Sequence, residues 1–256
     1  MIQKLTIAQS IAQAVNWKAH CADCIYLSGG TEVNRLGSED HQEGISIGRL
    51  NMDEIRMEGS MLAIGATVTF TEALESDLVP MGLKQALRHM DSMTKRNMAT
   101  IGGNIAAKRD DSYIIPALVA MDAKLSVMDL DRSQSQMSLW DYVSDPYSSR
   151  LLIIDILLDP KARIASRRIS RTAQSHASIT MSISLDPALA CAAIKGTGIV
   201  RLEGVEKAIA KGLGGKDLER IGSEEPCQVV DDIHASAAYK RYLLGILAAD
   251  LAGGLR

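Results

Sequence analysis

The stretch Arg96-Asn97-Met98-Ala99-Thr100-Ile101-Gly102-Gly103-Asn104-Ile105 is the most informative part of the chain. It brings together a hydroxyl, two adjacent glycines and a carboxamide, groups that can bind an anion through backbone N–H donors and side chains. A tight turn that needs left-handed backbone would use the same glycines, so this stretch alone leaves both interpretations open. It lies between two predicted helical regions, at residues 82–90 and 113–121.

An earlier glycine loop carries similar hydrogen-bonding groups. The apolar strand predicted at residues 24–27 stops at Ser28-Gly29-Gly30-Thr31-Glu32. Backbone N–H groups that follow a strand, with no Cβ to block a close approach, form an anion cradle, and the hydroxyls of Ser28 and Thr31 add hydrogen-bonding groups. Neither loop matches the Rossmann dinucleotide fingerprint or the phosphate-binding P-loop.

Taken together and in this order, the two loops resemble the flavin loops of the FAD-binding subunits of molybdenum hydroxylases. This is the family of xanthine dehydrogenase and carbon monoxide dehydrogenase. Residues 27–32 are similar to its first loop, an AGGT[DE]-like segment, and residues 96–105 are similar to its second loop, RNxATIGGNI. Residues 116–123 resemble the helix that follows in the family. The resemblance covers the whole chain, because the region from Arg150 onward resembles the family's C-terminal domain.

The resemblance implies an α+β protein. It would consist of a PCMH-type FAD-binding domain at residues 1–158, made of two α/β lobes at about 1–54 and 55–158. A small α+β C-terminal domain with an antiparallel sheet would follow at residues 159–256.

Local patterns predict individual elements. Thr6 and Gln9 have capping-box spacing, which predicts a helix that runs to about His20, and Thr69 and Glu72 begin another helix. Strands are expected at residues 24–27, 45–47, 61–64, 125–127, 150–158, 164–170 and 178–185, and an amphipathic helix at residues 236–251.

The resemblance also assigns cofactor-binding residues. The backbone N–H groups that hold the FAD pyrophosphate would be those of Leu27, Ser28, Gly29, Gly30, Thr31, Glu32 and Val33. The hydroxyl and amide of the second loop correspond to Thr100 and Asn104, with Gly103 beside them. Arg168 stands where the family carries a lysine near the flavin and keeps a positive charge for the N1–C2=O edge, although a guanidinium is not equivalent to an ammonium. Leu151 stands where the family makes an apolar backbone contact to the adenine half.

The chain departs from the family after the second loop. The family usually continues to SPxxDLLP, whose Asp takes a ribose hydroxyl, whereas here Tyr113 occupies that position and Asp110 and Asp111 precede it. Asp111 could serve instead, from an irregular backbone. Alternatively, Tyr113 uses its hydroxyl or ring, while the acidic pair favours the N-terminus of the next helix. We favour the second hypothesis, and we expect Lys108 and Arg109 to be solvated.

Composition narrows the function further. The chain has 256 residues with 28 Lys and Arg and 31 Asp and Glu, a net charge of −3, too close to neutral to favour nucleic acid or an anionic membrane. The absence of a long apolar run or a secretory-type start predicts no membrane insertion. Four cysteines fit a reducing compartment, so a cytoplasmic location is expected.

A metal site is not predicted. Cys21 and Cys24 have thioredoxin-like spacing, but no second such pair completes a zinc site, and we expect a buried pair without chemistry. The five histidines show no spacing typical of metal ligands.

By resemblance, this chain is an electron-transfer flavoprotein subunit that does not oxidise an organic substrate alone. Electrons released at a molybdenum-cofactor subunit would pass through the iron–sulfur clusters of another partner to the FAD bound here, and then to an acceptor such as NAD. The alternative is a structural or assembly subunit that has lost tight FAD binding, which Tyr113 at the usual Asp position favours. An independent oxidase of the vanillyl-alcohol oxidase type would need a longer substrate domain.

Overall fold

The computed structural model describes residues 2–21, 23–36, 43–90, 92–172 and 175–256. The chain forms two compact units, each assembled from separate segments. Unit 1 consists of Met1–Leu78, Ser92–Ala107 and Lys124–Leu157, and unit 2 of Val79–Asp91, Lys108–Ala123 and Leu158–Arg256. The mixture of helices with parallel and antiparallel sheets confirms the predicted α+β class.

Unit 1 contains two sheets. Its strands are β1 (Lys4–Ile7), β2 (Ile25–Leu27), β3 (Glu43–Ser46), β4 (Ile55–Glu58), β5 (Met61–Gly65), β6 (Lys124–Met128), β7 (Gln134–Ser138) and β8 (Leu152–Leu158). Its helices are α1 (Ile11–Ala19), α2 (Thr31–Leu36), α3 (Phe70–Glu75), α5 (Met93–Arg96), α6 (Ile101–Ala107), α8 (Leu139–Ser144) and the 3₁₀ turn η1 (Ser148–Arg150).

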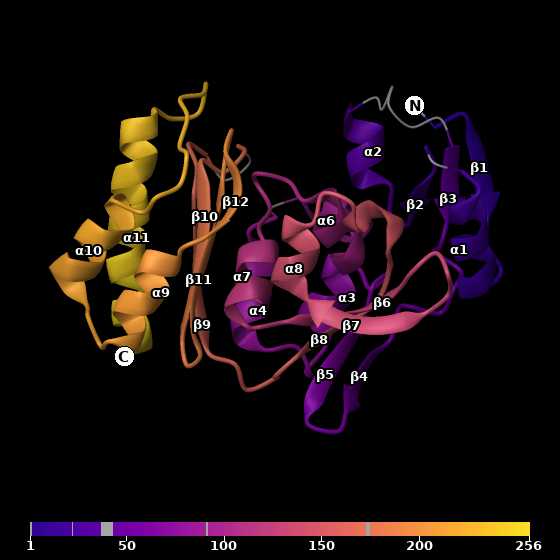
Figure 1. The fold of residues 1–256 in the computed structure, drawn as a ribbon, viewed down its shortest axis with the longest axis horizontal. Coiled ribbons are helices and arrows are strands. Elements are labelled where there is room, and N and C mark those ends of the chain that lie inside the picture. Colours follow the sequence, from indigo (N-terminus) through magenta and orange to yellow (C-terminus); the bar gives the residue numbers. More distant parts are fainter. Residues whose placement is uncertain (1, 22, 37–42, 91, 173–174) are drawn as a thin grey trace. The chain divides into compact units, whose positions relative to one another are not determined.

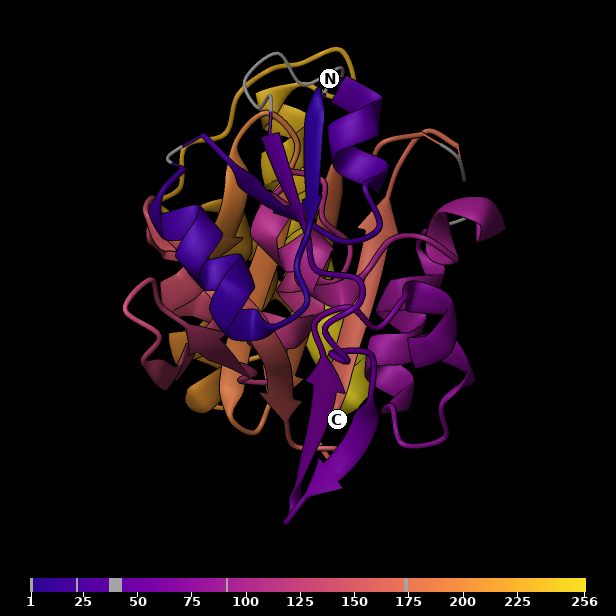
Figure 2. The same cartoon turned by 90° about the vertical axis from the view of Figure 1, so that its right-hand side faces the viewer.

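The small sheet of unit 1 has the order β1-β3-β2 with parallel pairing throughout. Residues of α1 and of this sheet share one hydrophobic cluster with the start of β8. The larger sheet has the order β4-β5-β8-β6-β7, and its β4–β5 hairpin extends downward in violet in Figure 2. Both glycine-containing stretches, residues 28–32 and 96–105, belong to unit 1.

The helix expected from Thr6 to about His20 is present, but its predicted start is wrong, because residues Lys4–Ile7 form β1 and pair with β3. Helix α1 begins one turn later, at Ser10. The Ser10 hydroxyl accepts a hydrogen bond from the Gln13 N–H, and the Gln13 carboxamide accepts one from the Gln9 N–H. The capping pattern is real, but a strand occupies the residues with the predicted spacing.

The helix expected from Thr69 is confirmed. The Thr69 hydroxyl accepts a hydrogen bond from the Glu72 N–H at 3.2 Å, and the Glu72 carboxylate accepts one from the Thr69 N–H at 2.7 Å. The two bonds satisfy donors that a helix N-terminus leaves without intrahelical partners. They also fix the start of α3, which lines the pocket described below.

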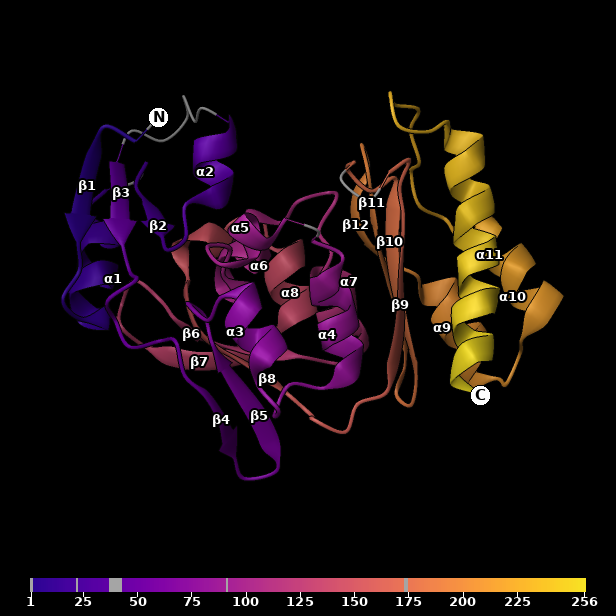
Figure 3. The ribbon, with the colours of Figure 1, turned by 180° about the vertical axis from the view of Figure 1, so that it is seen from behind.

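Unit 2 is a four-stranded antiparallel sheet between two layers of helices, which confirms the predicted antiparallel sheet. Its strands are β9 (Ile164–Ile169), β10 (Ile179–Leu185), β11 (Ala188–Ile194) and β12 (Gly198–Arg201), in the order β12-β11-β10-β9. Its helices are α4 (Met81–Arg88), α7 (Ile115–Ala120), α9 (Glu203–Ala210), α10 (Gly215–Ser223) and α11 (Ala237–Leu255). Figures 1 and 3 show α9, α10 and α11 on one face of the sheet, and α4 and α7 on the other.

Helix α11 confirms the predicted C-terminal helix and is longer than expected. Ser236 caps it by accepting a hydrogen bond from the Tyr239 N–H. Strand β11 was not predicted. Its sequence, ALACAAI, is buried on both faces, so it lacks the alternation of polar and apolar residues by which a half-buried strand is identified.

Cys21 and Cys24 form a disulfide, so the expectation of a pair without chemistry is wrong. Their Cα atoms lie 5.4 Å apart, within the range that a disulfide needs. Of the helices in the described part of the chain, none is long and apolar enough to span a bilayer.

Candidate functional site

The first glycine loop leaves the edge of the small sheet in unit 1. Strand β2 pairs in parallel with β3, and the last paired residue of β2 is Leu27, opposite Ser46. Gly30 has a φ of 66°, a left-handed conformation that side chains disfavour, and α2 begins at Thr31. Within the described part of the chain, the N–H groups of residues 28–31 donate to no backbone carbonyl. Residues 27–33 are half-buried, so this row of donors borders solvent.

The second stretch differs from the expected glycine loop, because residues 101–104 form the first turn of α6. The Ile101 N–H donates to the Val68 carbonyl at 2.9 Å, and the Gly102 N–H donates to the Ala66 carbonyl at the same distance. The Gly103 N–H donates to the Thr100 hydroxyl at 3.1 Å. These donors already have acceptors, so the stretch offers side chains rather than an open row of N–H groups.

Gly102 is required for packing. A Cβ at this position would lie 2.7 Å from both the Cβ and the carbonyl oxygen of Ala66. Gly103 is exposed, and Asn104 is half-buried on the following turn of the helix. The two glycines therefore have different roles. The first lets α6 approach the turn that precedes α3, and the second leaves the surface beside Thr100 open.

The two stretches meet around a pocket in unit 1 of about 280 Å³. It is lined by Ser28, Gly29, Gly48, Asp53, Thr67, Thr69, Glu72, Asn97, Met98 and Thr100. Of the sequence-predicted residues, Ser28, Gly29 and Thr100 line this pocket. Most of its lining is polar and includes the carboxylates of Asp53 and Glu72, which suits a ligand rich in hydroxyl groups.

Sequence reasoning missed seven of the pocket residues. Asn97 and Met98 belong to the stretch quoted first, so the motif itself was the available signal; Asn97 contacts Thr71, with 2.6 Å between the Oδ1 and Oγ1 atoms. Thr69 and Glu72 were recognised only as a helix start. Gly48, Asp53 and Thr67 had no local signal, because tertiary contacts bring them to the pocket.

Leu151 also belongs to unit 1. Its N–H donates to the Ser148 carbonyl at 2.9 Å, and its side chain is buried just before β8 begins. It is not among the residues that line the pocket.

Unit 2 holds a second group of predicted residues, Tyr113 and Arg168. The guanidinium carbon of Arg168 lies 5.3 Å from the centre of the Tyr113 ring, a cation–π geometry. Arg168 also donates to the carbonyl of Ser175. The charge of Arg168 is thus held between a ring and a carbonyl rather than on a free side chain.

His89 joins this group, although no sequence pattern marked it as a candidate. Its ring meets the Tyr113 ring edge-on, with 6.4 Å between the centroids. Burial, reinforced by the positive charge of Arg168, lowers the pKa of His89 to about 4. The imidazole is therefore neutral at pH 7, and Arg168 supplies the positive charge of this group.

Asp111 lies in an ion-pair network of unit 2. Its carboxylate accepts hydrogen bonds from Arg109 at 2.7 and 2.9 Å, from Lys195 at 3.4 Å, and contacts Nδ1 of His176 at 2.5 Å. Burial raises the pKa of Asp111, but the Arg109 hydrogen bonds and the neighbouring cations outweigh it and lower the pKa to about 2. Asp111 is therefore ionised, with its oxygens already engaged by side chains of its own unit.

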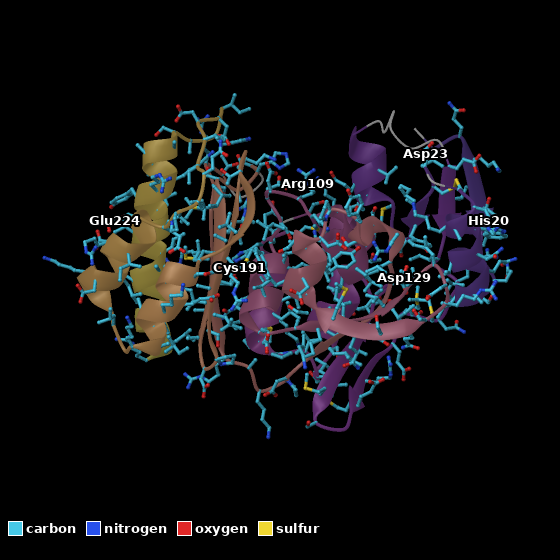
Figure 4. The ribbon with its side chains drawn as sticks, viewed as in Figure 1. His20, Asp23, Arg109, Asp129, Cys191 and Glu224 are labelled. Atoms are coloured by element: carbon cyan, nitrogen blue, oxygen red, sulfur yellow. A yellow bond between two sulfur atoms is a disulfide. The ribbon has the colours of Figure 1, made fainter. Side chains whose placement is uncertain are left out.

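Two smaller expectations about this segment are wrong. Arg109, labelled in Figure 4, is paired with Asp111 and its side chain is 19% exposed, rather than solvated. Asp110 accepts hydrogen bonds from Lys195 and from the Gly196 N–H rather than from the N-terminus of α7, where the Ser112 hydroxyl accepts one from the Ile115 N–H. The acidic pair is held by Arg109 and by residues just outside strands β10 and β11.

The chain is similar in sequence to a known protein family and to a curated protein. Residues 2–159 match a family model described as the FAD binding domain in molybdopterin dehydrogenase. The uncharacterized protein YgfM of Escherichia coli K12 is 31% identical over 256 residues, which cover 98% of this chain and 95% of that protein.

Solved structures share the fold. Carbon monoxide dehydrogenase from Hydrogenophaga pseudoflava, in a form that lacks the Mo-pyranopterin moiety of the molybdenum cofactor, matches with a TM-score of 0.89 at 17% identity, covering 100% of this chain and 97% of that chain. Quinoline 2-oxidoreductase from Pseudomonas putida 86 matches with a TM-score of 0.82 at 13% identity, covering 100% of this chain and 96% of that chain.

Proposed function

This chain belongs to the family of FAD-binding domains of molybdopterin dehydrogenases, and on that premise we propose that it is the electron-transfer flavoprotein subunit of its complex. The observation that carries the proposal is the row of N–H donors at residues 28–31, which borders a polar pocket in a chain of this family. When bound, FAD supplies the redox chemistry, and the chain supplies binding, orientation and charge.

The first loop fits a pyrophosphate. We assign this role to the N–H groups of residues 27–33. The left-handed Gly30 shapes the loop there, and the first N–H groups of α2 have no intrahelical acceptors. The Thr100 hydroxyl accepts from Gly103 and keeps its own hydrogen to donate to a ligand oxygen. Asn104, one turn along α6, is assigned as the second polar contact of that stretch.

Arg168 is assigned to the electron-rich edge of the flavin ring. A fixed positive charge there favours negative charge on N1 and on the C2 oxygen, and so makes the flavin easier to reduce. The Tyr113 ring and the Ser175 carbonyl hold the guanidinium in place, so little side-chain entropy is lost when it acts. Because His89 is neutral, Arg168 carries the positive charge of this group.

For the ribose, we retain Tyr113 as the proposed contact. A contact from Asp111 would compete with Arg109, Lys195 and His176 for the same two oxygens. Leu151 remains assigned to the adenine half through its backbone. Both assignments follow from position in the family's sequence.

The partners proposed are an iron–sulfur subunit, which delivers electrons, and a molybdenum-cofactor subunit, where they are released from substrate. NAD is the proposed acceptor of electrons from this chain. We propose that the division into an FAD-binding domain at 1–158 and a C-terminal domain at 159–256 is the functional one.

An assembly subunit without tight FAD binding is the second candidate. The replacement of the family's ribose-binding Asp by Tyr113 favours it, as does the engagement of the first N–H groups of α6 within the protein. On this hypothesis the fold is kept for contact with partner subunits alone.

An absorbance spectrum of the purified chain separates the two candidates. Flavoprotein bands at about 370 and about 450 nm, with one FAD per chain, are expected. A chain that stays colourless after incubation with excess FAD, alone and within its complex, would reject the electron-transfer function in favour of assembly.

The acceptor is tested by adding NADH to the FAD-loaded chain without oxygen. Bleaching of the 450-nm band is expected, and slower bleaching in Arg168→Ala than in the charge-preserving Arg168→Lys. No bleaching by NADH, in a chain that dithionite does bleach, would remove NAD from the proposal and leave FAD in it.

A further inference from the structure

Unit 1 also contains a pair of redox-capable sulfur atoms, whose cysteines are not among the residues that line the pocket. The sulfur atoms of Cys21 and Cys24 are bonded to each other, and Oε2 of Glu43 lies 3.7 Å from Sγ of Cys24. His20 and Asp23, which flank the cysteines, are labelled in Figure 4 beside the small sheet. We propose that Cys21 and Cys24 form a thiol–disulfide exchange centre whose substrates are dithiols.

The two sulfur atoms are unequally accessible. Cys21 is partly exposed, whereas Cys24 is 4% exposed and belongs to the hydrophobic cluster beneath the small sheet. Cys21, which packs at the margin of the same cluster, is therefore the more accessible residue, and we assign its sulfur as the one that an external thiolate attacks and the sulfur of Cys24 as the leaving group. Directed attack on one sulfur distinguishes an exchange centre from a fully buried structural disulfide.

Glu43 gives the reduced state a contact that the oxidised state lacks. It is the first residue of β3, its side chain is 40% exposed, and Lys4 donates to its Oε2 at 2.9 Å. A disulfide sulfur carries no hydrogen, so Cys24 donates nothing to Glu43 while the bond is intact. Once reduced, the Cys24 thiol can donate a hydrogen bond to the carboxylate, which stabilises the dithiol form.

The proposed reaction balances in two steps. One thiolate of the dithiol attacks Sγ of Cys21, the Cys21–Cys24 bond breaks, and the electron pair goes to the Cys24 sulfur, which takes a proton from solvent beside Glu43. The second thiolate of the reagent then attacks its own sulfur in the mixed disulfide, which releases Cys21 as a thiolate that is protonated. Two electrons and two protons pass from the dithiol to the protein, and the dithiol becomes a disulfide.

The other two cysteines serve as internal controls. Cys191 is fully buried on β11, and burial raises the pKa of its thiol well above the ordinary value; Figure 4 labels it. Burial also raises the pKa of the half-buried Cys227 thiol. Both are thiols without a cysteine partner, so neither is expected to change with the redox buffer.

The test equilibrates the full-length chain with mixtures of reduced and oxidised dithiothreitol, then quenches with acid and labels thiols with a maleimide. Peptide mass analysis should show Cys21 and Cys24 gaining label together and reversibly as the buffer becomes reducing, with unchanged circular dichroism. Reduction that occurs only with loss of the folded spectrum would overturn the proposal, because the disulfide would then be purely structural.

Matched charge variants test Glu43. Glu43→Gln should shift the dithiol–disulfide equilibrium about three- to tenfold toward the disulfide, because a neutral acceptor replaces a charged one. The control is Glu75→Gln, which removes the same charge from an exposed position on α3 and should leave the equilibrium unchanged. Equal shifts in the two variants would remove Glu43 from the centre.

Discussion

The carbonyl oxygen of Met98 occupies the space in which a side chain on Gly29 would begin. A Cβ at Gly29 would lie 1.7 Å from that oxygen and 2.7 Å from the carbonyl carbon. The first glycine loop therefore approaches the stretch at residues 96–105 through backbone atoms. The glycine is needed for this contact between protein segments, in addition to any close approach by a ligand.

Gly29→Ala should separate the two stretches and remove one wall of the pocket. We expect a destabilisation of about 1–3 kcal/mol, the usual cost of overpacking, and loss of most FAD from the purified protein. Chemical denaturation and the 450-nm absorbance per chain measure the two effects. Gly253→Ala, where a Cβ meets nothing within 4 Å, is the control. Wild-type stability and flavin content in Gly29→Ala would contradict this role.

Gly30→Val should abolish FAD binding while leaving the fold largely intact. Gly30 has a φ of 66°, which costs a β-branched residue on the order of 1–3 kcal/mol, so the loop would change conformation. The loop lies at the end of β2, outside the core. Flavin content and circular dichroism are the measurements, and a full complement of flavin in this variant would reject the loop as the pyrophosphate site.

Thr100→Ala and Asn104→Ala should each raise the FAD dissociation constant by about tenfold. Each removes a neutral hydrogen bond worth about 0.5–1.5 kcal/mol net. Thr100→Ala should also weaken the start of α6, because the Gly103 N–H loses its acceptor. Titration of the apoprotein with FAD gives the constants, with Thr100→Ser as the control that keeps the hydroxyl. Wild-type affinity in both alanine variants would mean that this stretch is only structural.

Tyr113→Ala should weaken FAD binding, and Tyr113→Asp should preserve or strengthen it by restoring the family's residue. Asp111→Asn should leave FAD affinity near that of the wild type but lower the free energy of unfolding by about 2 kcal/mol, since Arg109, Lys195 and His176 lose their carboxylate partner. Loss of flavin in Asp111→Asn, without an effect in Tyr113→Ala, would instead assign the ribose to Asp111.

Acid should destabilise the protein in two ranges of pH. His89 has its pKa lowered to about 4, so the unfolded chain binds its proton first and stability falls as the pH drops from about 6.5 to 4. Asp111 has its pKa lowered to about 2, so its contribution is complete above about 4 and is lost toward 2. His89→Gln should flatten the first range of a stability-against-pH curve and Asp111→Asn the second. A wild-type slope between pH 6.5 and 4 in His89→Gln would show that another group titrates there.

Local sequence identified much of the fold where a pattern and its tertiary setting agree. The Thr69–Glu72 capping box and the Ser236 start of α11 both appear as expected. It failed at Thr6, where a capping spacing lies in a strand, because pairing with β3 outweighs local propensity. It also failed at β11, where burial on both faces erases the periodic signal.

The residues of the candidate site likewise fall into those that local sequence could predict and those that it could not. The first loop could be predicted because a strand followed by two glycines constrains the backbone directly. Asp53 and His89 could not, since each reaches its group through contacts distant in sequence. The ion pairs of Asp111 were equally hidden, because Lys195 and His176 come from residues far along the chain.

Unit 2 is assembled from three separate segments of the chain, so it cannot be separated from unit 1 by a single cut in the gene. Helices α4 and α7 pack on the C-terminal sheet, yet they are encoded between segments of unit 1. A fragment ending at residue 158 would leave in water the faces of α4 and α7 that pack on β9, β10 and β11. Such a fragment should be poorly soluble, and recombination that exchanges only the C-terminal portion between relatives must preserve the surfaces of two helices encoded far upstream.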